Sequence, residues 1–162
     1  MTLNWKSIAL AGSLAGLMAF ANLASGAARI DDSTHARIKV VHAKFTPALN
    51  LAAGDRAQRI FDLKTRRRSR ATLVVSSRTS PLAGAVRIRV DRCAKAWRSR
   101  GATFSCKGKT VVVLSDSPAL GKHALRKLSG RNANHLRLTL TLPQSAPNAL
   151  QGQAAKLTYK FS

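Results

Sequence analysis

The chain has 162 residues, which is enough for one domain with a hydrophobic core and too few for two ordinary domains. It carries 28 Lys and Arg against six acidic residues, all of them Asp, so its formal net charge at pH 7 is +22. Because so large an excess cannot be neutralised within the protein, it excludes an electrically balanced surface and predicts short-range attraction to polyanions.

The N-terminus has the pattern of a secretory signal peptide. Lys6 is followed by 17 uncharged, mostly apolar residues at 7–23 and by small residues at 24–28. This order predicts export with cleavage after Ala27, or one residue earlier, after Gly26. A retained membrane anchor is the alternative, since the uncharged run reaches the lower limit for spanning a bilayer. We favour cleavage, which leaves no membrane span and 27 Lys and Arg against the six Asp.

After a polar leader at residues 28–36, residues 37–162 are expected to form one all-β domain. Three segments alternate apolar and polar residues with a period of two, which places one face in the core and one in water. Four weaker segments have strand composition, and the two with adjacent valines are expected to be covered on both faces. In chain order, the predicted strands are 37–43, 57–63, 71–76, 86–90, 110–115, 136–142 and 157–161.

One segment, residues 118–129, has apolar residues at helical spacing, and it predicts one short helix or an ordered loop. About seven antiparallel strands joined by short turns predict a β-sandwich or jelly roll. The turn residues that separate the strands lie at 53–55, 80–81, 107–109 and 143–152.

Two cysteines, Cys93 and Cys106, lie in the exported part and predict one disulfide, which stabilises by about 3 kcal/mol in the loop-entropy model. A redox or metal-binding pair is the alternative, but the spacing is not C-x-x-C and no His lies beside either residue. Trp97 lies between the two cysteines. We expect its ring to cover the sulfur atoms and the edge of the core, and stacking on a sugar or base is the alternative.

The densest positive cluster is the tip at residues 64–70, which joins two predicted strands and has Asp62 as its only acidic neighbour. Arginine side chains at a turn can each grip phosphate or carboxylate oxygens two at a time. The tip is therefore a candidate polyanion site, and a solvated loop on a generally basic protein is the alternative. The candidate polyanion-binding residues are Arg66, Arg67, Arg68 and Arg70 in the tip, with Arg87 and Arg89 on one face of the strand at 86–90.

The residues needed for catalysis are not brought together by any recognisable motif. His35, His42, His123 and His135 lack metal-ligand spacing, and no Ser stands in a G-x-S-x-G context. The aspartates are isolated or lie in the leader, so they do not indicate a glycosidase pair. We therefore expect no enzyme activity, no cofactor and no metal.

Two segments carry a resemblance to a known family. They are Leu51-Ala-Ala-Gly54-Asp55 before Ile60-Phe-Asp-Leu63, and the stretch from Leu138-Thr-Leu-Thr-Leu142-Pro143 to Gln151-Gly152 before the last strand. They resemble the camelysin and TasA-like family of exported bacterial proteins, which share a Leu-x-Pro-Gly-Asp turn and a Leu-Pro-x-x-Ala-x-Asn-x-x-Gln-Gly stretch. Ala53 stands where that family has proline.

The resemblance covers residues 51–161, and the pair Cys93 and Cys106 around Trp97 is similar to what actinobacterial members carry. It implies a jelly-roll fold and a role as a biofilm-matrix fibre subunit, in which the N-terminal strand of one protomer completes the sheet of the next. The protease role of the camelysin branch is not supported by any residue here.

Together these patterns predict a secreted structural or adhesive protein. Its expected partners are anionic polymers of the cell envelope or extracellular matrix, such as a cell-wall polyphosphate or an acidic polysaccharide, with self-association as a further expectation. The alternative from another class is a basic nucleic-acid-binding module that acts on extracellular DNA. A secreted metalloprotease is the least favoured, because it needs a metal-ligand cluster that the sequence lacks.

Overall fold

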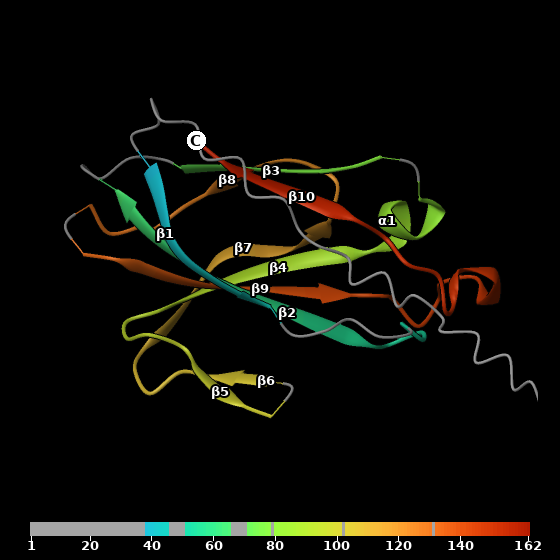
Figure 1. Ribbon diagram of the computed structural model, residues 1–162, viewed down its shortest axis with the longest axis horizontal. Coiled ribbons are helices and arrows are strands. Elements are labelled where there is room, and N and C mark those ends of the chain that lie inside the picture. Colours follow the sequence, from blue (N-terminus) through green and yellow to red (C-terminus); the bar gives the residue numbers. More distant parts are fainter. Residues whose placement is uncertain (1–37, 46–50, 66–70, 79, 102, 131) are drawn as a thin grey trace, which may run out of the picture.

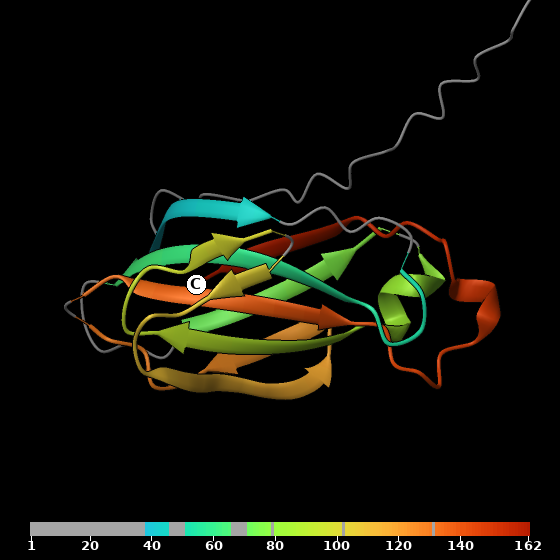
Figure 2. The ribbon, with the colours of Figure 1, turned by 90° about the horizontal axis from the view of Figure 1, so that it is seen from below.

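The structure is a computed structural model that describes residues 38–45, 51–65, 71–78, 80–101, 103–130 and 132–162. These residues form two antiparallel sheets that face each other, and a short ribbon lies outside the larger sheet (Figures 1 and 2). The all-β sandwich predicted from the sequence is confirmed. The elements are β1 (Ile38–Phe45), β2 (Arg56–Thr65), β3 (Ala71–Ser77), α1 (Pro81–Ala85), β4 (Arg87–Cys93), β5 (Arg98–Arg100), β6 (Thr103–Ser105), β7 (Thr110–Pro118), β8 (Gly121–Leu125), β9 (Asn134–Thr141), the 3-10 turn η1 (Asn148–Leu150) and β10 (Leu157–Phe161).

The larger sheet has the strand order β1-β2-β9-β4-β7, the smaller sheet has the order β10-β3-β8, and the ribbon pairs β5 with β6. Strand β9 is central because it pairs with β2 on one side and β4 on the other. Its leucines are buried while the residues between them are half-buried, so the period of two in the sequence separates the core face from the outer face. All seven predicted strands are present, with ends that differ by a few residues.

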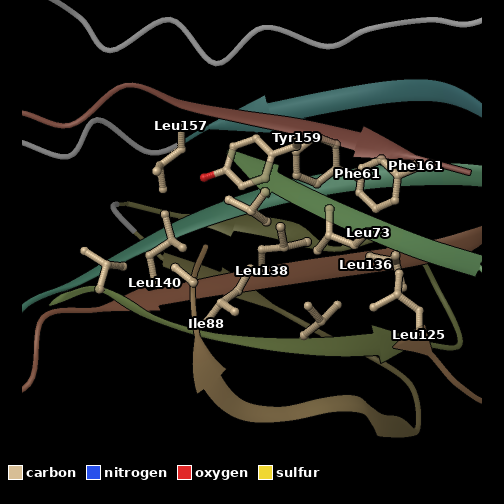
Figure 3. Close-up of a cluster of buried hydrophobic side chains, with 14 of the residues drawn as sticks. Phe61, Leu73, Ile88, Leu125, Leu136, Leu138, Leu140, Leu157, Tyr159 and Phe161 are labelled. Carbon is tan, nitrogen blue, oxygen red and sulfur yellow. The ribbon is translucent and has the colours of Figure 1, made fainter. Parts of the chain in front are cut away.

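An aromatic cluster joins the two sheets (Figure 3). The ring of Phe61 in β2 lies 5.5 Å from that of Tyr159 and 5.1 Å from that of Phe161, both in β10. The rings are tilted by 58° and 59°, which suits the edge-to-face preference of aromatic pairs. Full burial of each such side chain stabilises the fold by about 1.5 to 3 kcal/mol.

A polar pair lies beside this cluster. Arg59 is only 9% exposed on the inner face of β2, and its Nη1 donates to the carbonyl oxygen of Gln58 at 2.9 Å. Burial lowers the pKa of Arg59. Burial also raises the pKa of Tyr159 to about 12, although the charge of Arg59 and a side-chain hydrogen bond to it act in the opposite direction.

The helix expected at residues 118–129 is wrong. Pro118 ends β7, and Gly121 begins β8 at φ +123°, a left-handed conformation that an α-helix does not contain. Strand β8 then pairs with β3 and turns Leu125 inward while Ala124 is exposed, so the apolar residues do not share one helical face. The short helix is α1 instead, and Pro81 occupies its first turn, where the missing N–H is not needed.

The two valine-rich strands are covered on one face only, which corrects a second expectation. In β3 the buried residues alternate with half-buried ones. In β7 Val113 is buried but Val112 is 37% exposed. Strand β7 forms an edge of the larger sheet, and its exposed residues show that its outer face is open to solvent.

The two segments that carry the family resemblance meet at one end of the sandwich. The N–H of Gly54 donates to the carbonyl oxygen of Leu142 at 2.7 Å, and the N–H of Leu142 donates to that of Asp55 at 3.1 Å. The N–H of Gly152 donates to the carbonyl oxygen of Leu51 at 3.3 Å. Gly54 has φ +90°, a conformation that favours glycine. Within the described residues, no helix is both long and apolar enough to cross a membrane.

Candidate functional site

The ribbon lies on the outer face of the larger sheet, the face turned away from β3 and β10 (Figures 1 and 2). The chain leaves β4 at Cys93 and returns to the sheet at Thr110, and we call residues 94–101 and 103–109 the ribbon loop. A disulfide joins Cys93 to Cys106, with 5.9 Å between the two Cα atoms, as the sequence predicted.

Phe104 is the main apolar side chain that the ribbon loop buries. It is 4% exposed, and its backbone N–H donates to Oε1 of Gln58 in β2 at 2.9 Å. Ile60 lies two residues further along the same outer face and is also only 4% exposed. The burial of Phe104 and its bond to Gln58 therefore anchor the ribbon loop to the outer face of the sheet.

A buried ion network ties the ribbon loop to the sheet. Asp91 in β4 is 2% exposed and accepts a bond from Nη2 of Arg137 at 2.9 Å and from Nε of Arg89 at 3.1 Å. Nη1 of Arg137 also donates to the carbonyl oxygen of Phe104 at 3.1 Å. One guanidinium thus joins β9, β4 and the ribbon loop, so breaking it disturbs all three.

Trp97 lies against the outer face of the larger sheet, at strand β9. Its Nε1 donates to the carbonyl oxygen of His135 at 3.0 Å, and the guanidinium of Arg137 lies 4.3 Å from the centre of its ring. The ring is half-buried, with its N–H and one face already in use. At most one face of the ring is left for stacking on a sugar or a base.

Every aspartate that the structure describes is bonded within the fold. Asp62 lies 2.7 Å from Nδ1 of His135, and Asp116 is paired with Nε of Arg87. Asp55 accepts a bond from the N–H of Ala52 at 2.7 Å, and Asp91 is held as described above. No described carboxylate is paired with a cation of the ribbon loop.

The cations of the ribbon loop are exposed. Their side chains make no ion pair or hydrogen bond within the described part of the chain. No acidic residue occurs anywhere between Asp91 and Asp116 in the sequence. This surface therefore carries a local excess of positive charge that no described carboxylate neutralises, and such an excess attracts anions. The five side chains are Lys95, Arg98, Arg100, Lys107 and Lys109.

The structure places only part of the site predicted from the sequence. Arg66, Arg67, Arg68 and Arg70 lie outside the described residues. Arg87 and Arg89 do share the outer face of β4, with side chains 39% and 50% exposed, but each is bonded to an aspartate. Their charges are thus partly neutralised, unlike those of the ribbon loop.

The roles of Asp91, of Arg137 and of the pair formed by Asp62 and His135 are not predicted by the sequence. Asp91 and Arg137 are 46 residues apart, and the other pair is separated by 73 residues, so no local motif marks them. The acid-free stretch between Asp91 and Asp116 was the available signal for the ribbon loop. Among the described residues, no three metal-ligating side chains form a group.

Comparisons with protein-family models, curated proteins and solved structures found no significant match to this chain.

Proposed function

We propose that this protein is an exported, non-catalytic β-sandwich that binds anionic polymers of the cell envelope or extracellular matrix. One observation carries the proposal: each described carboxylate is bonded within the fold, whereas five exposed cations of the ribbon loop have no partner among the described residues. Such a surface attracts polyanions over about one Debye length, roughly 8 Å at physiological ionic strength.

Export is supported by the signal-like N-terminus and by the disulfide between Cys93 and Cys106. Disulfides of this kind persist in oxidising compartments outside the cytoplasm. The intact mass of the protein recovered from a culture medium tests this part of the proposal. We expect a chain that begins at Ala28, and a mass that still includes residues 1–23 would contradict it.

The finer assignment is a jelly-roll member of the camelysin and TasA-like family, and it remains a proposal. It is supported by the contact between the two resembling segments, where Gly54 and Leu142 are joined through their backbones. The proposed role as a matrix component, including self-association, follows from that resemblance.

A second candidate is binding to extracellular DNA. Phe61, Phe104, Tyr159 and Phe161 are buried, and Trp97 is covered on one face by Arg137. These five rings are therefore poorly exposed for base stacking, which single-stranded nucleic acid binders use. Contact with the phosphates of duplex DNA needs no such ring, so duplex DNA is the form to test.

Binding at two salt concentrations tests the general proposal. We expect the purified exported protein to bind polyglycerol phosphate or duplex DNA at about 50 mM salt and at least tenfold more weakly at about 200 mM, because charge neutralisation releases counterions. Absence of binding at the lower salt concentration, or an affinity that does not change with salt, would contradict the proposed function.

A further inference from the structure

We infer that the ribbon loop is a preorganised platform for a linear phosphodiester polymer, with Arg98 and Arg100 as its central contacts. The inference rests on the proposed function and goes beyond it, because it locates the contact and names the chemistry of the ligand.

The strand register decides where the two arginines point. In the β5–β6 ribbon Ser99 pairs with Phe104, so these two side chains share a face, and Phe104 is buried against the sheet. Arg98 pairs with Ser105 and Arg100 with Thr103, and these pairs occupy the opposite face. Both arginines therefore project away from the sheet into solvent, and both are exposed.

Three further cations surround this pair. Lys95 precedes β5, and Lys107 and Lys109 follow β6, all exposed and without a described carboxylate partner. Of the aspartates on the same outer face, Asp91 is buried and already holds Arg89 and Arg137, and Asp62 lies against Nδ1 of His135. The positive potential of the ribbon loop is therefore reinforced by its neighbours and not cancelled by the sheet below.

The ribbon loop is held in place before any ligand binds. The disulfide closes its base, the N–H of Phe104 donates to Gln58, and the carbonyl oxygen of Phe104 accepts from Arg137. Trp97 adds a bond to the backbone of β9. Because its backbone is fixed at several points, less conformational entropy is lost when a polymer binds.

The outward arginines suit phosphodiesters better than sparsely charged sugars. Two residues along a strand are roughly 6.6 Å apart, a distance comparable to that between adjacent phosphates of a phosphodiester chain. Each planar guanidinium can bind one phosphate through two parallel N–H bonds. A polysaccharide with a carboxylate on every second sugar spaces its charges more widely. Adjacent carboxylates therefore cannot bind Arg98 and Arg100 at the same time.

A pair of matched variants tests the location. The ribbon variant carries Lys95→Ser, Arg98→Ser and Arg100→Ser. The control variant carries Arg78→Ser, Lys122→Ser and Arg126→Ser, which are exposed residues in or directly after strands β3 and β8 of the smaller sheet. Both variants lose one Lys and two Arg, so their net charges are equal. Thermal unfolding checks that both remain folded.

The probes are polyglycerol phosphate, duplex DNA and hyaluronan, each titrated at several salt concentrations. We expect the ribbon variant to bind both phosphodiesters at least tenfold more weakly than the parent, and the control variant to lose about threefold or less. The slope of log K against log salt on duplex DNA should become shallower by about two to three in the ribbon variant, because about 0.9 counterions are released per phosphate contact.

The possible results separate the two levels of the account. If the parent binds none of the polymers, the proposed function fails. If the parent binds but the ribbon and control variants lose equal affinity, the ribbon loop is not the platform, although the proposed function stands. The same conclusion follows if the variant Arg66→Ser, Arg67→Ser, Arg68→Ser and Arg70→Ser loses more affinity than the ribbon variant. If hyaluronan binds the parent as tightly as polyglycerol phosphate, the assignment to phosphodiesters is overturned. A stronger ribbon effect on one phosphodiester than on the other identifies the source of the ligand.

Preorganisation has its own test at constant charge. The double variant Cys93→Ser and Cys106→Ser keeps every Lys and Arg but removes the bond at the base of the ribbon loop. We expect it to bind polyglycerol phosphate severalfold more weakly than the parent at a temperature where both are folded. Equal affinity would show that the platform does not depend on its disulfide.

Discussion

At the scale of single residues, the aspartates decide how the charge of this protein is distributed. Asp91 is itself shielded from water and pairs with both Arg89 and Arg137, so its one negative charge offsets one of their two positive charges, whereas Asp116 holds Arg87 at the surface. The side chain of Asp91 is 3% exposed and that of Asp116 is 57% exposed. The two ion pairs should therefore differ greatly in what they contribute to stability.

Asp91→Asn should lower the free energy of unfolding by about 3 kcal/mol, because it leaves the guanidinium of Arg137 largely buried without its counter-charge. Asp116→Asn is the matched control, and it should cost no more than about 0.5 kcal/mol because water replaces the lost contact. Urea denaturation of both variants measures the difference. Equal losses would show that the network under the ribbon loop is not a stabilising one.

Tyr159 gives a pH-dependent signal from the core. Its pKa is raised to about 12 by burial, whereas an unfolded tyrosine ionises near 10. The folded state therefore retains the phenol proton where the unfolded state loses it, and the resulting stability is complete below pH about 10. It should be lost as the pH rises through about 12, by about 2 to 3 kcal/mol in total.

The chain contains one tyrosine, so the ultraviolet absorbance of tyrosinate reports the ionisation of Tyr159 alone. We expect tyrosinate to form near pH 12 in the folded protein and near pH 10 in denaturant. The loss of stability over this interval should be smaller in Tyr159→Phe. A midpoint near 10 in the folded protein would contradict the burial of this ring.

At the scale of elements, the sequence predicts the strands that have one face in the core and the other outside it. In β4, β9 and β10 apolar and polar residues alternate because one face lies in the core and the other outside, so the period of two was enough to predict these strands. Strand β8 was missed because Leu125 within it and Leu120 and Leu128 beside it also fit a helical spacing. The pairing with β3, which decides the matter, is a long-range contact.

The ribbon strands β5 and β6 could not be predicted from local pattern. Each has three residues, and β5 is exposed throughout, so neither shows an apolar period. Their position depends on the disulfide and on Gln58, which lies 46 residues from Phe104 in the chain. The densest run of charge was visible in the sequence, but the internal partners that neutralise other cations were not.

The disulfide is an element-scale contribution that can be measured. Its sequence separation of 13 gives a stabilisation of about 3 kcal/mol in the loop-entropy model. The double variant Cys93→Ser and Cys106→Ser should therefore unfold at lower urea concentration than the parent. Relative to the parent, the exchange rates of its ribbon-loop amides with solvent should increase more than those of the β9 amides. If exchange rises uniformly through both sheets, the disulfide stabilises the whole sandwich and does not specifically hold the ribbon loop.

At the scale of the whole molecule, apolar packing and charged groups occupy different layers of the protein. Between the two sheets, aromatic contacts such as those of Phe61 with Tyr159 and Phe161 join one sheet to the other. The outer face of the larger sheet carries the buried ion network, and the ribbon loop above it carries the unpaired cations. The network under the ribbon loop has one carboxylate for two arginines, so it does not offset the positive charge that the ribbon loop displays outward, which is the basis of the proposed binding.

Amide chemical-shift mapping of the isotope-labelled mature protein tests this account most directly. The protein is titrated with short polyglycerol phosphate oligomers at low salt, and every backbone amide is followed, including those of the tip at residues 64–70. We predict that the largest shift changes occur at residues 94–109, with small changes along β3 and β10. Changes concentrated in the tip, or spread evenly over all exposed Lys and Arg, would contradict the account.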